Sequence, residues 1–437
     1  MQVTRVTFDE LQLIPELLRG VREAGYEQPT PIQRDTIPPA LEGRDIIGCA
    51  QTGTGKTAAF ALPVLQLLDA RVGDEPRIRA LVLTPTRELG AQINASFATY
   101  GKHLELWHMV IFGGVKDGPQ KEELRRGVDV LIATPGRLLD LINQGEISLG
   151  GVEIFVLDEA DRMLDMGFLP DVKRVTAMLP TKTRRQTLFF SATMPPEIRA
   201  LAGELLHDPV SVTEARLAEP VDLVTQQIYF VDKAQKRELL LEVLEQTGGT
   251  RVLVFSRTKH GANRIAKVLD RRGVVVAAIH GNKSQAARTR ALEGFRQGDL
   301  RVLVATDLAA RGLDVDGITH VINFDLPNEP ETYIHRIGRT ARAGASGIAI
   351  SFCDADERPF LVDIERLIKQ HIPQVLEHGY PPSQPPPAPT RLDGPPGPSS
   401  SRPAAGSRSA SRAGGDRRGR GGRRGRGGRR PDPRRRA

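Results

Sequence analysis

The sequence has 437 residues, of which 39% are hydrophobic and 26% are charged, so it is long enough for two or more folded domains. Its two cysteines, Cys49 and Cys353, are too few for a disulfide-stabilised scaffold and indicate a reducing compartment. No apolar run reaches the roughly 18 residues of a membrane span, and the first residues lack the apolar segment of a secretory signal. We therefore expect a soluble, cytoplasmic protein that does not bind membranes.

The formal net charge of +8 is unevenly distributed along the chain. Residues 381–437 contain 15 Arg, three Asp and neither Lys nor Glu, which gives this segment a charge of +12 and leaves −4 for the rest. The segment is rich in Pro, Gly and Ser and has too few apolar residues to fold alone. Its repeat RRGRGGRRGRGGRR at 417–430 favours sequence-independent contact with RNA. Docking on an acidic protein, or a purely solubilising role, is the alternative.

In the first half of the chain, short apolar runs alternate with longer amphipathic runs. The short runs are apolar on both faces, and the longer runs between them have helical patterns. This alternation predicts an α/β fold, in which a parallel sheet is covered by helices. The predicted strands cover residues 45–50, 80–85, 108–114, 128–135, 153–159 and 187–193.

The alternation weakens at 207–223, where Pro209 and Pro220 interrupt a polar stretch, and then restarts. The second set of predicted strands covers residues 226–231, 251–256, 274–281, 300–307, 320–325 and 347–353. We predict two tandem α/β domains with parallel sheets and a disordered basic C-terminal tail, Pro-rich and then Arg/Gly-rich. The predicted segments are a first domain at 1–208, a linker at 209–223, a second domain at 224–379 and the tail at 380–437.

The segment AQTGTGKT at 50–57 lies between a predicted strand and an apolar helical pattern, which is the context of a phosphate-binding loop. Its glycines allow backbone N–H groups to face phosphate oxygens, and the helix adds its positive N-terminal end. Lys56 supplies a charge for the outer phosphates, and Thr57 offers a hydroxyl to Mg²⁺. A glycine-rich turn without a ligand is the alternative. The predicted nucleotide-binding residues are Ala50, Gln51, Thr52, Gly53, Thr54, Gly55, Lys56 and Thr57.

Three carboxylates follow the apolar run at 154–157, namely Asp158, Glu159 and Asp161. Such a cluster needs a positive partner, and a strand that ends in an acidic pair opposite a phosphate loop is typical of a Mg²⁺–nucleotide site. We expect Asp158 to hold the metal and Glu159 to orient and deprotonate the attacking water. A capped helix start is the alternative, because acids favour helix N-termini.

These motifs resemble those of the DEAD-box family of RNA helicases, and they appear in order across residues 8–344. The resemblance implies two RecA-like domains, ATP and Mg²⁺ as cofactors, and RNA as a partner. GYEQPTPIQ at 25–33 is similar to the family's Q motif, which implies that Gln33 hydrogen-bonds adenine and that Phe8 stacks near it. The spelling DEADRMLDMGF is most similar to the bacterial RhlE-type subgroup.

The resemblance also implies how RNA is bound. The expected contacts go to phosphates and 2′-hydroxyls, so RNA is preferred with little sequence specificity. The family's RNA-contacting motifs are matched by PTRELGAQ, a glycine pair and TPGR in the first domain, and by VFSRT, the Gln–Arg pair and ATD in the second. The implied RNA-binding residues are Pro85, Thr86, Arg87, Gly113, Gly114, Thr134, Pro135, Gly136, Arg137, Arg257, Gln285, Arg288, Thr306 and Asp307.

The segment HRIGRTARAG at 335–344 matches the motif that supplies arginine fingers. By resemblance, Arg339 and Arg342 reach the γ-phosphate and join Lys56 and Glu159 as catalytic residues, while Asp314 contacts the ribose. A basic amphipathic helix on a solvated face is the alternative. The residues implied to couple ATP hydrolysis to unwinding are Asp161, Ser191, Thr193 and His335.

We predict an ATP-dependent RNA helicase whose ATPase is stimulated by RNA and which locally unwinds short duplexes or remodels RNA–protein complexes. The ATP site is expected in a cleft between the two domains. The resemblance also admits ribosomal or RNA-degradation proteins as partners. Two alternatives remain open: an RNA-binding scaffold or annealing factor with weak ATPase, and a DNA-directed motor. The complete set of catalytic residues argues against the first, and the Q motif argues against the second.

Overall fold

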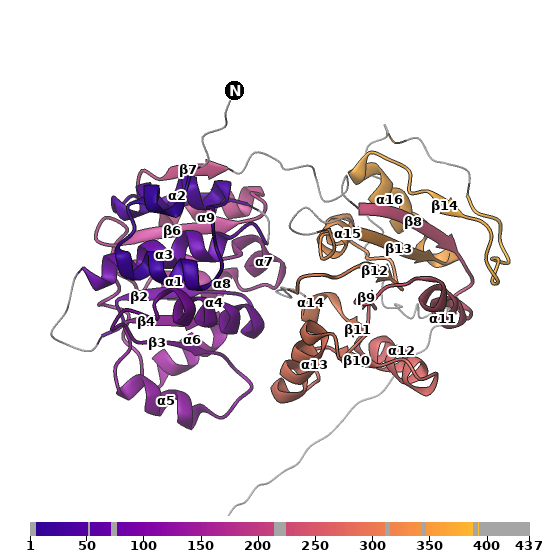
Figure 1. The fold of residues 1–437 in the computed structure, drawn as a ribbon, viewed down its shortest axis with the longest axis horizontal. Helices are drawn as coiled ribbons and strands as arrows, with labels where there is room; N and C mark the ends of the chain where they lie inside the picture. Colours follow the sequence, from indigo (N-terminus) through magenta and orange to yellow (C-terminus); the bar gives the residue numbers. More distant parts are fainter. Residues whose placement is uncertain are drawn as a thin grey trace, which may run out of the picture. The chain divides into compact units, whose positions relative to one another are not determined.

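The computed structural model describes residues 6–50, 53–70, 77–213, 224–310, 315–341, 347–387 and 392. Residues 6–213 and 224–387 form two α/β domains, as the alternating pattern predicted. Figure 1 labels the helices and strands of both domains.

The described part of the first domain contains a seven-stranded parallel sheet and helices on both of its faces. Its strands are β1 (Ile46–Cys49), β2 (Ala80–Leu83), β3 (His108–Ile111), β4 (Val130–Ala133), β5 (Ile154–Leu157), β6 (Gln186–Ser191) and β7 (Val210–Thr213). Its helices are η1 (Phe8–Leu11), α1 (Pro15–Glu23), α2 (Pro31–Leu41), α3 (Lys56–Asp69), α4 (Arg87–Tyr100), α5 (Asp117–Arg125), α6 (Pro135–Asn143), α7 (Ala160–Asp165), α8 (Leu169–Thr176) and α9 (Pro196–Leu205).

The second domain has the same construction. Its described strands are β8 (Val224–Phe230), β9 (Val252–Phe255), β10 (Val276–Ile279), β11 (Val302–Ala305), β12 (His320–Asn323), β13 (Gly347–Cys353) and β14 (Gln374–Val375). Its described helices are α11 (Lys236–Gln246), α12 (Lys259–Arg271), α13 (Gln285–Gln297), α14 (Asp307–Ala310), α15 (Pro330–Ile337), η2 (Ala355–Glu357) and α16 (Arg358–Ile368).

The strand order of the two sheets is the same. It runs β3-β4-β2-β5-β6-β1-β7 in the first domain and β10-β11-β9-β12-β13-β8-β14 in the second. Each neighbouring pair is parallel, so the carboxyl ends of all strands in a sheet meet at one edge. Ligands of such sheets bind at this edge, where the loops and helix N-termini gather. The topology therefore brings together motifs that are far apart in the sequence.

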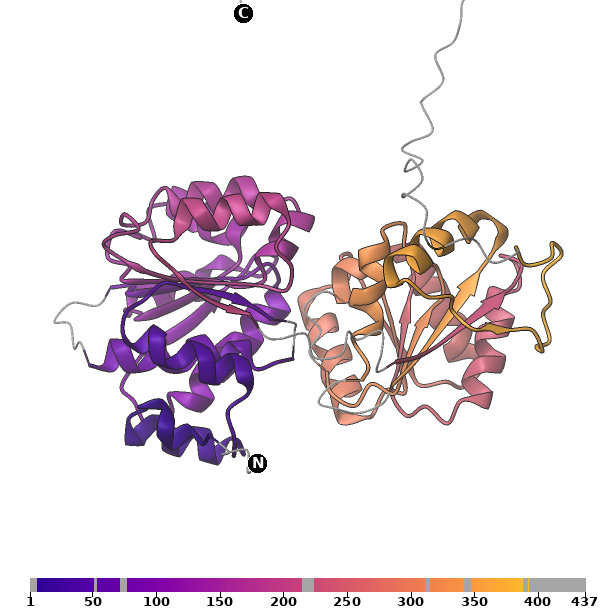
Figure 2. The same ribbon diagram turned by 90° about the horizontal axis from the view of Figure 1, so that it is seen from above.

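Two hydrophobic clusters enclose the first sheet, one on each face. Phe189 and Phe190 are consecutive residues of β6, and they enter opposite clusters because successive side chains of a strand point to opposite faces. Phe190 packs against Phe60 of α3, with ring centroids 5.5 Å apart. Figure 2 shows the same layers, with the indigo N-terminal helices on one face of this sheet and magenta helices on the other.

The structure differs from the predicted linker at 209–223. Val210–Thr213 form β7, which pairs with β1 in register from Ile46 opposite Val210. This strand is an edge strand with mostly accessible side chains, so it lacks the apolar run that marks the central strands. The first domain therefore extends to residue 213, and the rest of the predicted linker lies outside the described residues.

The second domain also extends further than predicted. Residues 380–387, which we predicted to begin the disordered tail, are described, and some of them are bound to the folded domain. The backbone N–H of Ser383 donates to the Asp232 carboxylate at 3.1 Å, and Arg358 donates to the Gln384 carbonyl at 2.9 Å. Tyr380 packs on the core. The Arg/Gly-rich part of the tail lies outside the described residues.

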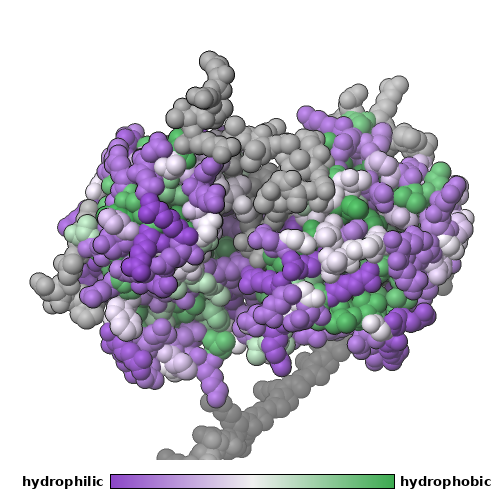
Figure 3. Space-filling view, viewed as in Figure 1, coloured by the Kyte–Doolittle hydropathy of each residue, from purple (hydrophilic) through white to green (hydrophobic). Residues whose placement is uncertain are grey.

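The described surface is mostly hydrophilic. Figure 3 shows polar residues over most of the visible face of both domains, with apolar residues in separate small patches. Among the described residues, no helix is long and apolar enough to cross a membrane.

Candidate active site

The phosphate loop begins where β1 ends, and its described residues lie beside the buried Lys56 at the start of α3. Gly53 and Gly55 have φ angles of 89° and 91°, in the left-handed region that favours glycine. The ammonium group of Lys56 donates to the Ala50 carbonyl at 2.8 Å, which folds the loop back over the helix N-terminus. Thr57 follows on the first turn of α3 and is partly accessible. The left-handed conformation of both glycines is compatible with the predicted phosphate loop, and phosphate binding stays a prediction.

Gln33 lies beneath the phosphate loop. Its amide is only 1% exposed and has partners on both sides: Oε1 accepts from the Thr30 N–H at 2.9 Å, and Nε2 donates to the Gly55 carbonyl at 3.1 Å. A Cβ added to Gly55 would collide with this amide, so only glycine fits there. The sequence predicted an adenine contact for Gln33; the structure adds a direct connection between Gln33 and the phosphate loop.

A cavity of about 270 Å³ lies beside the Q motif and is lined by Phe8, Tyr26 and six neighbouring residues. Phe8 is only 5% exposed, so its ring is held in the core of the domain at the edge of this cavity. The cavity is large enough to accept a planar ring system. Of the two residues implied to contact adenine, Phe8 lines this cavity and Gln33 does not, and adenine binding there stays a prediction.

The acidic cluster follows β5, and its carboxylates are buried. Asp158 and Glu159 are each 3% exposed. Burial raises the pKa of Asp158 to about 7; the charge of Lys56 opposes this rise, and the charge of Glu159 adds to it. Two adjacent buried carboxylates repel each other, so a further positive charge would be favourable here. Oxygen donors such as these are the ligands that Mg²⁺ prefers, so the residues fit that metal.

Arg162 is a positive partner that the sequence analysis missed. Its Nη1 donates to Glu159 Oε2 at 2.6 Å, and the two side chains are 8% and 4% exposed. They are three positions apart across the start of α7, which is a spacing at which helical side chains meet. The (i, i+3) spacing in DEADR could have indicated this ion pair from the sequence. In this structure Arg162, together with Lys56, offsets the charge of the acids.

Asp161 is joined to the Ser191–Thr193 segment by several hydrogen bonds. Its Oδ2 accepts from the backbone N–H of Thr193 at 2.8 Å and from the Thr193 hydroxyl at 2.9 Å. Its own N–H donates to Ser191 Oγ at 3.2 Å. Burial alone would raise the pKa of Asp161, but Lys56, Thr193 and Arg162 hold it below its usual value. These bonds join three of the four residues implied to couple ATP hydrolysis to unwinding, and that coupling role stays a prediction.

The three implied RNA-binding segments of the first domain follow β2, β3 and β4, which are neighbours in the sheet. Thr86 caps α4, where its hydroxyl accepts from the Leu89 N–H at 3.2 Å. Thr134 takes the equivalent place before α6. Gly114 has a φ of 76°, and a Cβ there would collide with the guanidinium of Arg87. The residues that the sequence predicted for this surface are thus brought together: Pro85, Thr86, Arg87, Gly113, Gly114, Thr134, Pro135, Gly136 and Arg137.

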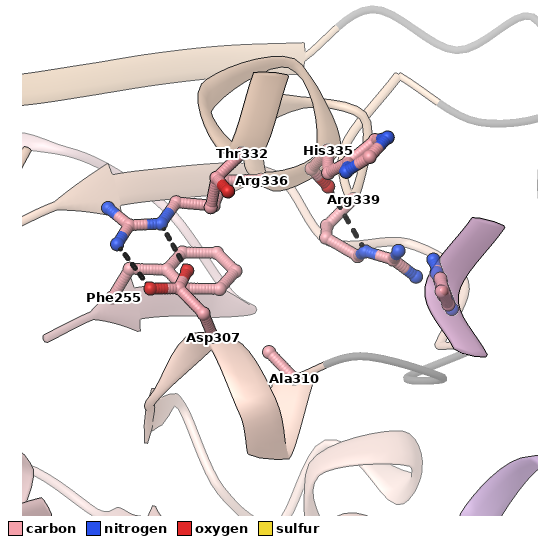
Figure 4. Close-up of a pocket in the computed structure, with 8 residues that line it drawn as sticks. Phe255, Asp307, Ala310, Thr332, His335, Arg336 and Arg339 are labelled. Atoms are coloured by element: carbon pink, nitrogen blue, oxygen red, sulfur yellow. Dashed lines mark hydrogen bonds and ion pairs between the residues drawn. The ribbon is translucent and has the colours of Figure 1, made fainter. Parts of the chain in front are cut away.

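In the second domain, Arg336 is one of the residues that line the pocket drawn in Figure 4. Its guanidinium donates to both carboxylate oxygens of Asp307, at 2.5 and 2.8 Å, and lies 4.9 Å from the ring centre of Phe255. The carboxylate of Asp307, which we predicted to bind RNA, is therefore engaged by an arginine of the same domain. Neighbouring Thr306 is buried, and its carbonyl accepts from the N–H of Ala310 at 2.9 Å.

The arginine-finger motif lies at the end of α15. Arg339 is 4% exposed, and its Nε donates to the His335 carbonyl at 3.3 Å, as Figure 4 shows. Burial lowers the pKa of His335, which favours the neutral imidazole. The predicted residues Gln51, Thr52, Asp314 and Arg342 lie outside the described residues, so their predicted roles have no structural description.

The remaining predicted RNA contacts of the second domain lie on one loop and one helix. Arg257 donates to a carboxylate oxygen of Glu357 at 2.5 Å and to the Leu326 carbonyl at 3.0 Å. Gln285 and Arg288 lie on the first turn of α13, which Ser284 caps. These side chains are partly accessible, so they can meet a ligand.

Two parallel sheets, a phosphate loop after the first strand and an acidic pair after another define a protein with two RecA-like domains. The family description "DEAD/DEAH box helicase" matches residues 30–201, and "Helicase conserved C-terminal domain" matches residues 235–344. An ATP-dependent RNA helicase RhlB of Pseudomonas syringae pv. tomato is 45% identical over 378 residues, which cover 85% of this chain and 95% of that protein. The chain therefore belongs to the DEAD-box helicase family.

Further relatives agree with this assignment. ATP-dependent RNA helicase CshA of Limosilactobacillus reuteri is 41% identical over 83% of this chain and 72% of its own length. The structure of S. cerevisiae Dbp5 bound to RNA and ADP BeF3 is 33% identical, with a TM-score of 0.75 over 84% of this chain and 95% of that chain. Mss116p bound to ssRNA and AMP-PNP has a TM-score of 0.76 at 28% identity, over 86% of this chain and 80% of that chain. Because the relatives named here are RhlB and CshA, the RhlE-type assignment stays a prediction.

Proposed function

We propose that this ATP-dependent RNA helicase hydrolyses ATP with residues from both of its RecA-like domains and uses the reaction to open short RNA duplexes or remodel RNA–protein complexes. The observation that carries the proposal is the buried cluster in the first domain. Asp158 and Glu159 lie at the carboxyl end of β5, with Lys56 of the phosphate loop as a charge partner. Buried acids beside a phosphate loop are what ATP hydrolysis requires.

Within this cluster we assign three roles. Lys56 binds the outer phosphates of ATP, and Glu159 orients the attacking water and accepts its proton. Thr57 and Asp158 would hold Mg²⁺, which supplies positive charge to the phosphate oxygens when bound. The raised pKa of Asp158 supports this assignment, because a buried carboxylate gains most from a nearby cation.

Adenine recognition is assigned to the Q motif. The cavity beside Phe8 would take the base, and Gln33 would read its edge. The Gln33 amide also donates to the Gly55 carbonyl, so adenine binding that moved Gln33 would also move the phosphate loop.

The second domain would complete the ATP site. We assign Arg339 and Arg342 as arginine fingers, which are worth roughly 10³–10⁵ in rate where they have been removed. His335 would meet Asp161, and Asp314 would contact the ribose. Because neither domain carries a full set of catalytic groups, hydrolysis requires both, and a ligand that draws them together accelerates it.

We assign RNA as the ligand that draws the two domains together. Two solved relatives, Dbp5 and Mss116p, are described as bound to RNA and a nucleotide. We propose that the backbone of the Gly113-Gly114 pair and the side chains of Arg87 and Arg137 hold one RNA strand by its backbone. Arg257, Gln285 and Arg288 of the second domain would contribute to the same surface. Ribosomal or RNA-degradation proteins are proposed as further partners. We also propose a cytoplasmic location, which the two free cysteines fit.

The proposal is tested by ATP turnover without nucleic acid, with RNA and with DNA of the same sequence. We expect turnover to rise strongly with RNA and weakly or not at all with DNA. Full-rate turnover without RNA would contradict the split site. Stimulation by DNA equal to that by RNA would favour a DNA-directed motor instead.

A further inference from the structure

Helix α5 buries an amide where a helix normally buries apolar side chains. Within this helix, Asp117–Arg125, Gln120 is the most buried residue, at 9% exposure. Burying an amide is unfavourable unless its donor and acceptor are both hydrogen-bonded. Both ends of the Gln120 amide therefore need hydrogen-bond partners.

The Gln120 amide joins two of the loops that follow neighbouring strands. Its Nε2 donates to the carbonyl of Phe112 at 3.2 Å, and its Oε1 accepts from Arg137 Nε at 3.2 Å. Phe112 directly precedes the Gly113-Gly114 pair, and Arg137 ends the TPGR segment. One side chain on α5 thus holds both loops, although α5 carries none of the family's motifs.

The Arg137 guanidinium is held by hydrogen bonds to two side chains, which use two of its three nitrogens. Besides the bond to Gln120, its Nη1 donates to Asp140 Oδ2 at 2.6 Å. Its Nη2 is buried and has no hydrogen-bond partner among the residues that the structure describes. An unsatisfied buried donor is unfavourable, and an RNA phosphate oxygen is the kind of acceptor that an arginine fork satisfies.

The glycine pair connects this pair of loops to a third segment. A Cβ at Gly114 would collide with the Arg87 guanidinium, so glycine at this position lets Arg87 lie close to the loop. Arg87 is therefore a neighbour of the glycine pair, and the Gln120 amide is the hydrogen-bonded link between the glycine loop and Arg137.

We propose that Gln120 is a positioning residue for RNA binding: it holds the Arg137 guanidinium and the Gly113-Gly114 loop in one fixed arrangement before the RNA strand arrives. This inference rests on the proposed function, in which these loops contact the RNA backbone. Ordering the loops in advance lowers the entropy lost on binding, so the effect appears as RNA affinity.

The first test replaces Gln120 by methionine, which has a similar volume and removes both hydrogen bonds. For Gln120→Met we expect the dissociation constant for single-stranded RNA and the KM for RNA to rise about tenfold, as the loss of two hydrogen bonds suggests. The kcat at saturating RNA and the KM for ATP should stay unchanged. A parallel loss of ATP affinity would show general damage to the domain and would overturn the proposal.

Gln144→Met is the matched control. Gln144 is an exposed glutamine that directly follows α6 and also donates to Asp140, at 2.9 Å; within the described part of the chain its side chain has no hydrogen bond to either loop. It should leave both affinities unchanged. Gln120→Glu then separates the two bonds, because a carboxylate can still accept from Arg137 but cannot donate to the Phe112 carbonyl. We expect its RNA affinity to lie between those of the wild type and Gln120→Met.

A double-mutant cycle with Arg137→Ala decides whether Gln120 acts through that arginine. We expect the loss caused by Gln120→Met to shrink at least about threefold when Arg137 is already absent. Fully additive losses would overturn the proposal. If Arg137→Ala alone bound RNA as well as the wild type, the proposed RNA role of TPGR would be wrong. If Arg137→Ala weakened binding and Gln120→Met did not, only the inference about Gln120 would be wrong.

Discussion

The ion pair between Arg336 and Asp307 gives a quantitative prediction for the second domain. Arg336 is 1% exposed and donates to the Asp307 carboxylate, to Asn323 Oδ1 at 3.1 Å and to the Asp325 carbonyl at 2.6 Å. The substitution Arg336→Met keeps an apolar side chain over Phe255 but removes all of these donors. The carboxylate and two further acceptors then lose their partner.

The expected loss of stability comes from the polar groups that Arg336→Met leaves without a hydrogen-bond partner. Removing one partner of a buried ion pair costs about 3–5 kcal/mol. Because the Asp307 side chain is 27% exposed, water partly solvates it, and we take about 3 kcal/mol for the pair. Asn323 is fully buried and adds about 1 kcal/mol for its orphaned oxygen. We therefore expect the free energy of unfolding of this domain to fall by about 4 kcal/mol.

Hydrogen exchange of the whole chain measures this loss domain by domain. A change of about 4 kcal/mol should speed exchange of the most protected amides of β9 and β12 about a thousandfold, while those of the first-domain sheet stay unchanged. Arg366→Met makes the same chemical change in a more exposed pair with Asp363, at 3.5 Å, and should cost under about 1 kcal/mol. A loss in Arg336→Met no larger than in this control would refute the reasoning.

Four further predictions concern the site and the tail. Lys56→Ala should weaken ATP binding about tenfold or more, whereas Glu159→Gln should keep ATP affinity and lose at least about 100-fold in turnover; equal losses of affinity in nucleotide titrations would contradict these roles. Gln33→Ala should slow ATP turnover, and GTP hydrolysis by the unmodified protein at the rate of ATP would exclude the adenine-reading role. Burial raises the pKa of Asp158 to about 7, and a Mg²⁺-nucleotide favours the ionised carboxylate. ATP affinity should therefore fall as the pH drops from 8 to 6, and ATP binding near pH 7 should release a proton. Calorimetry in buffers of different ionisation enthalpy measures this release, which Asp158→Asn should abolish. Deleting residues 388–437 should flatten the slope of log K against log salt for RNA by about 4 to 5 units while turnover at saturating RNA survives; an unchanged slope in binding titrations would exclude RNA contact by the tail.

The central strands of both sheets were predictable because their signal is strong. A strand buried on both faces, such as β5 or β11, is a continuous apolar run bounded by polar residues, and the run alone defines it. The edge strands β7 and β14 were missed, since an accessible edge strand has no such run. The Pro-rich segment at 380–387 was also placed wrongly, because specific hydrogen bonds rather than apolar burial hold part of it.

Residue types in the motifs were predictable, but the partners of their side chains were not. The sequence showed three acids in need of positive charge and indicated Mg²⁺ and Lys56, yet it did not show Arg162 as the direct partner of Glu159. It indicated that Asp307 belongs to an RNA motif, whereas the pairing with Arg336 depends on how α14 and α15 pack in the folded domain. Pairings between distant segments depend on topology, which a motif does not contain.

The two sheets place a geometric limit on how far the halves of the protein can separate. β7 is an edge strand of one sheet and β8 belongs to the other, so the chain between Thr213 and Val224 is anchored at both ends. Eleven peptide steps span at most about 40 Å. Each half therefore meets the other at an effective concentration in the millimolar range, independent of how dilute the protein is. The second domain thus needs only modest intrinsic affinity for the first, and bound ATP and RNA would favour assembly of the catalytic site that we propose.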